Sequence, residues 1–407
     1  MKYKLPKIQN ANLAGKRVFV RADLDVPLSE VRGQRLEARV EDDTRLVAGL
    51  PTIHYLLEQG AKVIIGGHLG RPKGVDKSLS LEPVAEWLRQ KFKVQSSKFK
   101  VRERDGFGGW EITPSLFLLE NLRFYEGEER NPSTHSVNSG QAGSGQEFAQ
   151  KLAKLADIYV NDAFAMCHRN HASIIGVASL LPHYAGLRLQ KEVEILGQIL
   201  ENPKRPLIVV IGGQKIETKL PLIEKMENFA DFVLVGGKIA QEAQKFKANL
   251  NSKVIVASSN QEGTDITAES LNQFLLIIKQ AKTIVWNGPM GRIGALLGNK
   301  NFLVPHSQTA RHANSENFVP SLRQNPSPAA GSPRSDSERG TEDLAKAIVE
   351  SSAYKVVGGG DTTEFIKRIG LFDPPAGGFD FVSTGGGAML TFLSGEKLPG
   401  LEALTAD

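Results

Sequence analysis

The sequence has little of what marks secreted and membrane-spanning proteins. Its 407 residues include a single cysteine, Cys167, so no disulfide can form within the chain and a reducing compartment is expected. No apolar run is long enough to cross a bilayer, and the N-terminal residues lack the apolar segment of a signal peptide. We therefore expect a cytoplasmic protein with no membrane partner.

The sequence also lacks a large excess of positive or negative charge. The chain has 50 Lys and Arg against 45 Asp and Glu, a formal net charge of +5 at pH 7. It contains no dense run of basic residues and no basic segment interleaved with aromatic residues, the patterns that are typical of nucleic-acid binding. The mild positive charge suits small anionic substrates better, and no nucleic-acid partner is expected.

Two common nucleotide-binding signatures are absent as well. The chain has no Walker A element, and no G-x-G-x-x-G follows any predicted strand. These absences exclude a P-loop and a dinucleotide fingerprint. A phosphate site in this chain must be built in another way.

Glycine, in contrast, is abundant where predicted strands end. Three glycine turns stand between a strand and a helix-compatible segment, at Gly212–Gly213, Gly358–Gly360 and Gly385–Gly387. A turn without side chains exposes backbone N–H groups at the positive end of the following helix dipole. One such turn is equally compatible with a close backbone crossing. Three of them, one followed by Lys215 and Lys219, indicate a polyphosphate site.

Strand-like and helix-like segments alternate in two blocks. In the first block, strands are predicted at 16–20, 62–67, 116–119 and 157–160, with helices at 44–59, 80–93 and 147–155. In the second, strands are predicted at 207–211, 231–235, 253–257, 283–286, 355–357 and 379–382, with helices at 269–279, 341–352 and 363–369. This alternation predicts an α/β protein with doubly wound parallel sheets. A helical segment at 187–200 lies between the blocks and is predicted to connect them.

Cationic residues follow the strands of the first block. They come after four different strand ends, because His68 and Arg71 share one: Arg21, His68, Arg71, Arg123 and Arg169. Ligands of parallel sheets bind at these carboxyl ends, and Arg45 at the start of the first helix can join them. Any one of these is more often a solvated surface residue. Together they predict a basic bowl for a carboxylate or phosphate, because guanidinium groups bind both oxyanions bidentately.

Other segments carry weaker signals. Residues 107–109 are predicted to form a turn and residues 131–146 a mobile surface loop. Residues 294–339 lack periodicity and are far longer than a normal loop, so we expect a disordered insertion. Asp361 stands where a strand meets a helix. It is placed to cap that helix or to hold Mg²⁺ beside a nucleotide, and the two roles are compatible. His68 and His171 have no partners with metal-ligand spacing, so anion or packing roles are favoured.

The ordered set of motifs resembles that of the phosphoglycerate kinases. The segments are RADLDVP (21–27), HLGRP (68–72), LLENLRF (118–124), YVNDAF (159–164), HRNHAS (168–173), IGGQKIETK (211–219), IVWNGPMG (284–291), VVGGGDTT (356–363), STGGGA (383–388) and LPGLEAL (398–404). The resemblance covers nearly the whole chain apart from the insertion. It implies two Rossmann-like domains that face each other across a cleft, namely a triose domain (1–185), a hinge helix (186–202), a nucleotide domain (203–392) and a tail (393–407) that returns to the first domain.

The resemblance also implies an activity. It is reversible phosphoryl transfer from 1,3-bisphosphoglycerate to ADP with Mg²⁺, giving 3-phosphoglycerate and ATP in glycolysis and gluconeogenesis, by a monomer. The implied triose-binding residues are Asp23, Leu24, Asp25, Arg45, His68, Leu69, Gly70, Arg71, Arg123 and Arg169. The implied nucleotide-binding residues are Gly213, Lys219, Gly237, Asn287, Gly359, Gly360, Asp361 and Thr362, with Asp361 on the metal. The groups implied around the transferring phosphoryl are Arg45, Lys215, Lys219, Gly386 and Gly387.

Three positions depart from the family pattern. Asp25 stands where asparagine is usual, Gln214 where a small residue is usual, and Gly294 where a ribose-binding glutamate is usual. A carboxylate at Asp25 should weaken binding of an anionic triose unless an arginine neutralises it, and Arg21 is the nearest candidate along the strand. Two alternatives therefore stay open: a regulatory binding protein on the same fold that has lost catalysis, and a kinase for another carboxylate.

Overall fold

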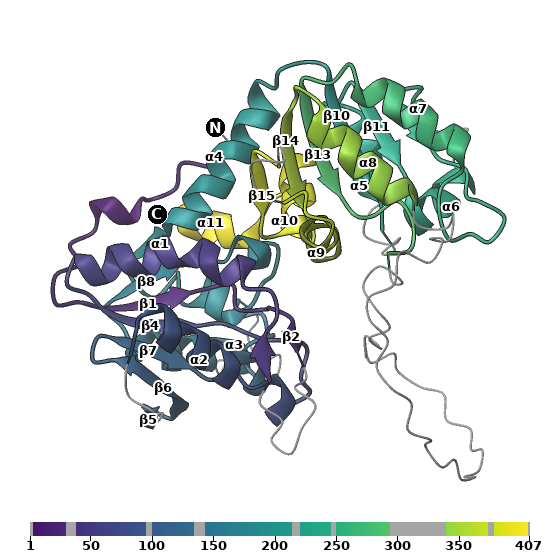
Figure 1. Ribbon diagram of the computed structural model, residues 1–407. Helices are drawn as coiled ribbons and strands as arrows, with labels where there is room; N and C mark the ends of the chain where they lie inside the picture. The colour runs from purple at the N-terminus through teal and green to yellow at the C-terminus, as the bar shows by residue number, and fades with distance from the viewer. Residues whose placement is uncertain are drawn as a thin grey trace, which may run out of the picture.

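The computed structural model describes residues 3–29, 38–94, 100–133, 143–213, 220–245, 250–293, 339–372 and 378–405. Within them, two β-sheets with helices on their faces form two parts of the molecule (Figure 1). We call the elements from β1 to β9 the N-terminal part and those from β10 to α10 the C-terminal part. The predicted α/β class with two mainly parallel sheets is confirmed. No helix in the described ranges is both long and apolar enough to cross a membrane.

The N-terminal sheet has the strand order β5-β6-β7-β4-β1-β8-β9. Five of its strands run parallel: β1 (Arg17–Arg21), β4 (Lys62–Gly66), β7 (Leu116–Leu119), β8 (Ile158–Asn161) and β9 (His183–Ala185). The helices are α1 (Thr44–Glu58), α2 (Glu82–Lys91) and α3 (Ser144–Lys154), and a small separate sheet pairs β2 (Leu28–Ser29) with β3 (Arg39–Val40). The register pairs Arg21 with both Gly66 and Asn161. The ends of the three central strands are therefore level with one another, and the loops that follow them emerge at one edge.

The turn predicted at 107–109 is wrong, because these residues begin a strand. An antiparallel hairpin of β5 (Lys100–Arg104) and β6 (Phe107–Thr113) extends the sheet beyond β7, and the chain turns at Asp105 and Gly106, which both have positive φ. A Cβ on Gly109 would lie 2.1 Å from the carbonyl oxygen of Leu118. The glycine that suggested a turn is there because a neighbouring strand passes close to it.

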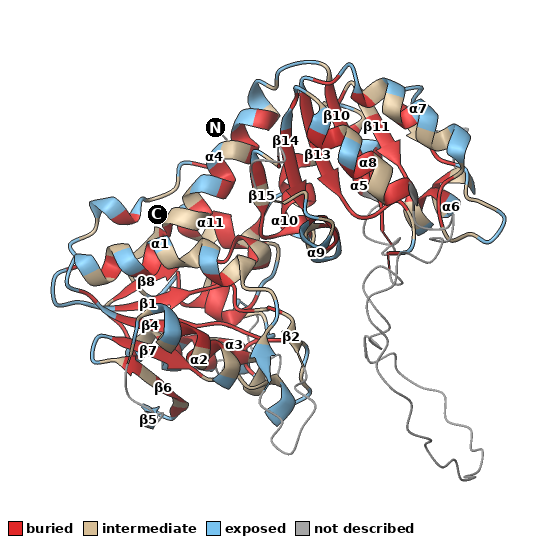
Figure 2. Cartoon of the chain, viewed as in Figure 1, coloured by how far each residue is buried: buried red, intermediate tan, exposed pale blue. Residues whose placement is uncertain are grey.

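The C-terminal sheet is entirely parallel, in the order β12-β11-β10-β13-β14-β15. Its strands are β10 (Leu207–Ile211), β11 (Phe232–Val235), β12 (Val254–Val256), β13 (Thr283–Asn287), β14 (Tyr354–Gly358) and β15 (Phe381–Ser383). Its helices are α5 (Leu220–Met226), α6 (Gly237–Lys245), α7 (Ala268–Ile278), α8 (Arg339–Glu350), α9 (Gly360–Arg368) and α10 (Gly386–Leu393). All of β10 is buried (Figure 2). The chain winds outward from β10 in one direction and from β13 in the other, so the ligand crevice of such a sheet is expected between the carboxyl ends of these two strands.

Two helices connect the parts. Helix α4 (Leu187–Glu201) runs from the end of β9 toward β10, and α11 (Pro399–Thr405) lies against the N-terminal part (Figure 1). The backbone N–H of Gly400 donates to the carbonyl of Cys167 at 2.8 Å, and that of Leu398 donates to the Tyr3 hydroxyl at 3.1 Å. The chain therefore crosses between the two parts twice.

A buried carboxylate ties α4 to the turn after β15. Glu192 is fully buried, and its Oε1 accepts from the backbone N–H and the hydroxyl of Thr384 at 2.8 and 2.9 Å. The same oxygen lies 2.7 Å from Nη2 of Arg188, which also donates to the carbonyl of Val382. The Arg188–Glu192 ion pair on α4 thus fixes the position of the glycine turn that precedes α10.

Removal of the Glu192 carboxylate should destabilise the protein strongly. Glu192→Ala leaves Arg188 and the Thr384 donors without their acceptor, which typically costs about 3–5 kcal/mol for a buried pair. Lys225→Ala is the control, because it breaks an exposed pair with Glu396 and should cost at most ~1 kcal/mol. Urea unfolding followed by circular dichroism measures both. Equal losses in the two variants would contradict the role given to Glu192.

Candidate active site

Two aspartates and an arginine meet beyond the end of β1. The Asp23 side chain is buried, and its Oδ1 lies 3.3 Å from Nη1 of Arg45 on α1. The same Arg45 nitrogen donates to the backbone carbonyl of Asp25 at 3.0 Å and lies 3.9 Å from its carboxylate. Oδ1 of Asp25 accepts from the backbone N–H of Gly70 at 2.9 Å. These contacts join the RADLDVP and HLGRP turns into one lining.

Asp23 has an oxygen that is not used within the described part of the chain. Burial raises the pKa of the Asp23 carboxyl, and the Arg45 guanidinium acts against this shift. Among the described residues, the buried Oδ2 atom has no hydrogen-bond partner. A buried acceptor without a donor is costly. A hydroxyl group of a bound ligand would supply that donor.

Arg21 does not neutralise Asp25, contrary to the expectation from its place on the strand. Its side chain is fully buried and donates to the hydroxyl of Ser173 at 2.8 Å. Arg45 is the cation that lies beside Asp25. Strand periodicity puts the Arg21, Asp23 and Asp25 side chains on one face only while the strand continues, and β1 ends at Arg21.

The remaining predicted cations differ in their surroundings. Arg123 is mostly buried: its Nη1 donates to the carbonyl of Gly70 at 2.6 Å and its Nε lies 2.9 Å from Glu129. Burial lowers the pKa of Arg123, and Glu129 opposes that effect. Arg71 and Arg169 are exposed to solvent. Arg123 therefore holds the HLGRP turn in place, while Arg71 and Arg169 are open to a ligand.

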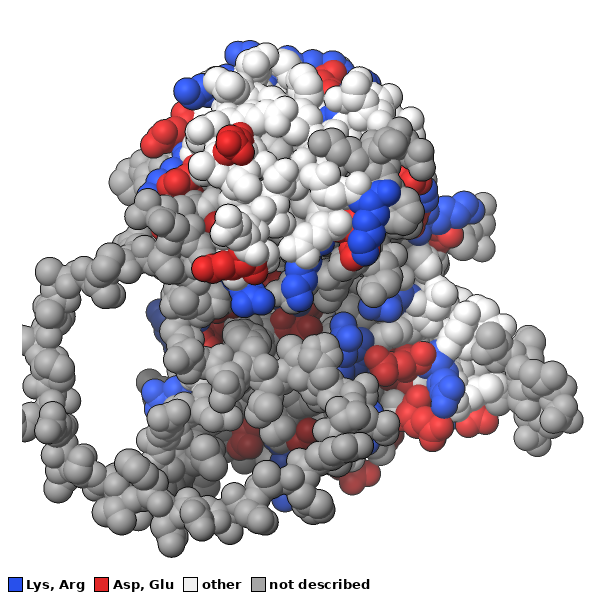
Figure 3. Space-filling model, turned by 90° about the vertical axis from the view of Figure 1, so that its right-hand side faces the viewer, with Lys and Arg blue, Asp and Glu red and all other residues white. Residues whose placement is uncertain are grey.

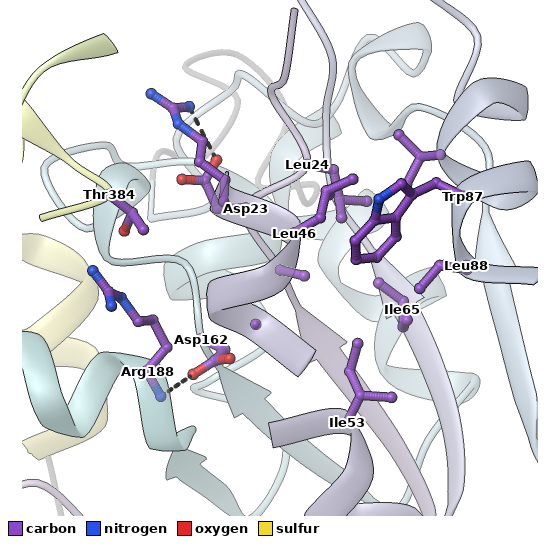
Figure 4. A pocket seen from close by; sticks show the side chains of 14 residues that line it. Asp23, Leu24, Leu46, Ile53, Ile65, Trp87, Leu88, Asp162, Arg188 and Thr384 are labelled. Atoms are coloured by element: carbon purple, nitrogen blue, oxygen red, sulfur yellow. Dashed lines mark hydrogen bonds and ion pairs between the residues drawn. The ribbon is translucent and has the colours of Figure 1, made fainter. Parts of the chain in front are cut away.

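A hollow joins this lining to the C-terminal part. Most of its lining comes from the N-terminal part and includes Asp23, Arg45 and Asp162 along with apolar side chains such as Trp87. Arg188 of α4, which lies beside Asp162, and Thr384 of the β15–α10 turn complete it (Figure 4). Asp162 caps α4, because its Oδ1 accepts from the backbone N–H groups of Arg188 and Leu189 at 3.0 and 3.2 Å, and burial raises its pKa to about 7. Sequence reasoning did not name Asp162, although it lies within the motif at 159–164.

Two of the residues predicted to bind a nucleotide hold the strand ends of the C-terminal sheet together. The buried Asn287 side chain donates to the carbonyl of Gly358 at 3.1 Å, and the buried Thr362 hydroxyl accepts from the backbone N–H of Gly288 at 2.8 Å. Gly360 and Asp361, in contrast, are exposed at the first turn of α9. Asn287 and Thr362 therefore shape the turn, and Gly360 and Asp361 face outward from it.

The glycine turns before α9 and α10 touch each other. A Cβ on Gly386 would lie 2.5 Å from the Asn287 side-chain nitrogen and 2.5 Å from the backbone N of Gly359. Gly359 itself has a φ of 101°, which favours glycine strongly. The N-termini of the two helices therefore converge, and their free N–H groups and dipoles add at one place. That arrangement suits a phosphate group.

Gly237 and Gly213 flank the crevice on the β10 and β11 side. The backbone N–H of Gly213 donates to the carbonyl of Pro289 at 2.8 Å, and that of Gly237 to the carbonyl of Met290 at 2.8 Å. Lys215 and Lys219, together with Gln214 and Gly294, lie outside the described residues.

The two glycines that begin α10 should respond differently to substitution by alanine, with a loss of stability at Gly386 and little change at Gly387. Gly386→Ala places a methyl group against backbone and amide atoms at 2.5 Å, and overpacking of this kind costs about 1–3 kcal/mol. At Gly387 a Cβ meets no described atom within 4 Å, so Gly387→Ala should be close to neutral. Thermal unfolding and nucleotide binding measured by calorimetry test both variants. Retained binding and stability in Gly386→Ala would show that the two turns need not touch.

The fold and the site define an α/β protein of two parts. In the C-terminal part, two helix N-termini converge in an arrangement suited to a phosphate group, and in the N-terminal part arginine side chains lie beyond the ends of the strands. A sequence profile described as phosphoglycerate kinase matches residues 8–249, 239–295 and 330–396. The phosphoglycerate kinase of Desulforudis audaxviator is 39% identical over 98% of each chain, and the chloroplastic phosphoglycerate kinase 1 of Arabidopsis thaliana is 34% identical over 98% of this chain and 81% of its own.

Solved structures agree with these sequences. The phosphoglycerate kinase structure from Coxiella burnetii matches with a TM-score of 0.68 and 30% identity, covering 98% of this chain and 99% of that one. The Pyrococcus horikoshii structure matches with a TM-score of 0.70 and 27% identity over 98% of each chain. The chain belongs to the phosphoglycerate kinase family, a family of phosphotransferases with a carboxyl group as acceptor. The resemblance drawn from the motifs is confirmed.

Proposed function

We propose that this chain transfers a phosphoryl group reversibly between 1,3-bisphosphoglycerate and ADP, giving 3-phosphoglycerate and ATP in glycolysis and gluconeogenesis. The observation that carries the proposal is the shared hollow, in which Asp23 and Arg45 of the N-terminal part stand with Thr384 beside the glycine turn of α10. A triose acid held by the first two residues would present its carboxylate to a phosphate held by that turn. Family membership supports the same reaction.

The triose acid would bind to the N-terminal part. The orphaned Oδ2 of Asp23 would accept its hydroxyl, and the exposed Arg71 and Arg169 would bind its phosphate. His68 would donate a hydrogen bond from the floor of the site. Leu24, Leu69, Gly70 and Arg123 would complete the lining by holding the two turns together.

The nucleotide would bind at the carboxyl ends of the C-terminal sheet. We propose that Gly213, Gly237, Gly359 and Gly360 contact it, with Asn287 and Thr362 as supports and Lys219 as an added cation. Mg²⁺ fits this lining, because Asp361 provides an exposed carboxylate in the first turn of α9, where a phosphate group would bind. Protein-bound Mg²⁺ commonly uses one carboxylate plus substrate phosphates. The described residues hold no cluster of three metal-ligating side chains. Asp361 would hold the ion, which would neutralise phosphate charge.

The chemistry would need no general base. The attacking carboxylate of 3-phosphoglycerate is already ionised, and phosphoryl transfer depends on alignment and on positive charge around the equatorial oxygens. The amides of Gly386 and Gly387 would supply part of that charge. Arg45, Lys215 and Lys219 would supply the rest.

The two substrates would sit on opposite domains, which we take as residues 1–185 and 203–392, so transfer would require closure about the hinge helix at 186–202. Ion pairs between the parts support this geometry: Lys367 lies 2.9 Å from Asp42, and Arg368 lies 3.9 Å from Glu41. Figure 3 shows basic and acidic side chains close together at the height of this junction.

X-ray scattering should give a smaller radius of gyration with both substrates than with either alone, and an unchanged radius would contradict closure.

A coupled assay tests the proposed function directly. Purified protein with 3-phosphoglycerate, ATP and Mg²⁺ should produce 1,3-bisphosphoglycerate, detected through a dehydrogenase that consumes it. Nucleotide binding without turnover would instead support a regulatory protein on this fold. Turnover with a different carboxylic acid alone would indicate another small-molecule kinase.

Asp25 should weaken binding of the triose acid. Asp25→Asn keeps an oxygen for the Gly70 N–H but removes a negative charge next to the anionic ligand. A charge pair about 4 Å apart in a solvated site is worth about 1 kcal/mol, so KM for 3-phosphoglycerate should fall by about fivefold with kcat little changed. Glu58→Gln, which removes an equal charge from the exposed far end of α1, is the control. An unchanged KM in Asp25→Asn would mean that Arg45 already offsets the carboxylate.

A further inference from the structure

Arg21 is a fully buried arginine at the end of β1 that the proposed reaction does not use directly. Each nitrogen of its guanidinium group has a defined neighbour. Nε donates to the Ser173 hydroxyl at 2.8 Å, and Nη1 donates to the backbone carbonyl of Ala22 at 2.5 Å. Nη2 lies 3.1 Å from Nδ1 of His68. The guanidinium plane is therefore held in one orientation.

A buried glutamate balances the charge of Arg21. Oε1 of Glu128 accepts from the Ser173 hydroxyl at 2.6 Å, and Oε2 accepts from the backbone N–H of Ser173 at 3.1 Å. The carboxylate lies 3.8 Å from Nη2 of Arg21 and 3.6 Å from Nδ1 of His171. Ser173 thus donates to Glu128 while it accepts from Arg21. This hydrogen-bond pattern fixes the Arg21 and Glu128 side chains beneath the RADLDVP and HLGRP turns.

The contact between Arg21 and His68 determines where the histidine carries its proton. Arginine has N–H donors and no acceptor, and it does not lose its proton in proteins. The His68 nitrogen that faces it, Nδ1, must therefore be the acceptor. A neutral imidazole with an acceptor at Nδ1 carries its hydrogen on Nε2.

We propose that Arg21 is a positioning residue that holds His68 as the Nε2–H tautomer, so that His68 presents one fixed hydrogen-bond donor to the bound triose acid. Nε2 lies on the ligand side of the ring, 3.8 Å from the Asp25 carboxylate. The assignment of the ligand rests on the proposed function, whereas the tautomer rests on the Arg21 contact alone.

The surroundings of His68 keep it neutral as well. Besides Arg21 on β1, it faces Arg45 on α1, Arg123 after β7, His171 and the Asp25 carboxylate. Burial, followed by the charges of Arg21 and Arg123, holds the pKa of His68 well below its ordinary value of 6.5. His68 then contributes a hydrogen-bond donor, and no positive charge, to the site that the sequence suggested was a cationic bowl.

Nuclear magnetic resonance tests the tautomer independently of catalysis. In the full-length protein with ¹⁵N-labelled histidine, His68 should show a protonated Nε2, an unprotonated Nδ1 and no titration between about pH 5.5 and 8. His68→Gln identifies its signals among those of the 8 histidines. Arg21→Met should restore titration or mix the tautomers, whereas Arg17→Met, at the exposed start of the same strand, should change neither. A titrating His68 or a protonated Nδ1 in the wild type would overturn the proposal.

Two substitutions at His68 distinguish the roles of its two ring nitrogens, and neither removes a member of the Arg21–Glu128 pair. Glutamine places an amide nitrogen near the Nε2 position, while asparagine reaches only as far as Nδ1. His68→Gln should therefore keep KM for 3-phosphoglycerate within about threefold, and His68→Asn should raise it by about tenfold or more, as expected when a buried acceptor loses its donor. Equal effects of the two substitutions would count against the donor role. Absence of turnover in the wild type would refute the proposed function and leave the tautomer to be decided by the spectra.

Stability against pH gives a third measurement. Because His68 stays neutral when folded and gains a proton when unfolded below its ordinary pKa, the free energy of unfolding should fall as pH drops below about 6.5. His68→Gln removes this contribution. Its stability curve should be flatter than that of the wild type between about pH 6.5 and 5, and parallel curves would contradict a lowered pKa for His68.

Discussion

Contact between two glycine turns is the constraint on which the C-terminal part depends. Gly386 packs against Gly359 and Asn287 so closely that no side chain fits between them. This contact brings the N-termini of α9 and α10 to one place, where their unpaired amides can act on the same group. Each helix alone is short, and only their convergence gives the concentrated positive potential that a transferring phosphate needs.

The N-terminal part solves a different problem, because it must hold several charges close together beneath the Asp23–Arg45 contact. Arg21, Glu128 and Ser173 form a buried layer in which the two charges face each other and the Ser173 hydroxyl accepts from one and donates to the other. Above it stand Asp23, whose buried Oδ2 has no hydrogen-bond partner among the described residues, and the partly exposed Arg45. The lower layer fixes the geometry of the upper one, which under the proposed function would contact the substrate.

Helix α4 relates these two surfaces to each other. Asp162 caps its first turn from the N-terminal part, and Glu192, one turn further on, accepts from Thr384 of the C-terminal part. A rotation of this helix would move the β15–α10 turn relative to Asp23 and Arg45. Asp162, Arg188 and Thr384, which help to join the two parts, also line the hollow.

Much of the fold could be predicted from sequence, because a parallel strand buried on both faces leaves an apolar run followed by glycine or a charged turn. The runs at 207–211 and 116–119 became β10 and β7 with the predicted bounds. Gly108 and Gly109 misled the prediction, since a glycine needed for close approach of a neighbouring strand looks the same in sequence as one needed for a turn. The hairpin that contains them depends on contacts with β7, which local patterns do not record.

The sequence by itself determined the alternation of strands and helices in two blocks, the family and the residues that can carry charge or bare amides, because these follow from periodicity and from motifs at strand ends. Only the tertiary structure decided what each charged residue does. Arg21 and Arg45 are both candidate ligands in the sequence, yet one is buried against His68 and the other stands beside Asp25. The physical reason is that burial and pairing depend on partners such as Glu128 and Ser173, which lie more than a hundred residues away along the chain from Arg21 and beside it in space.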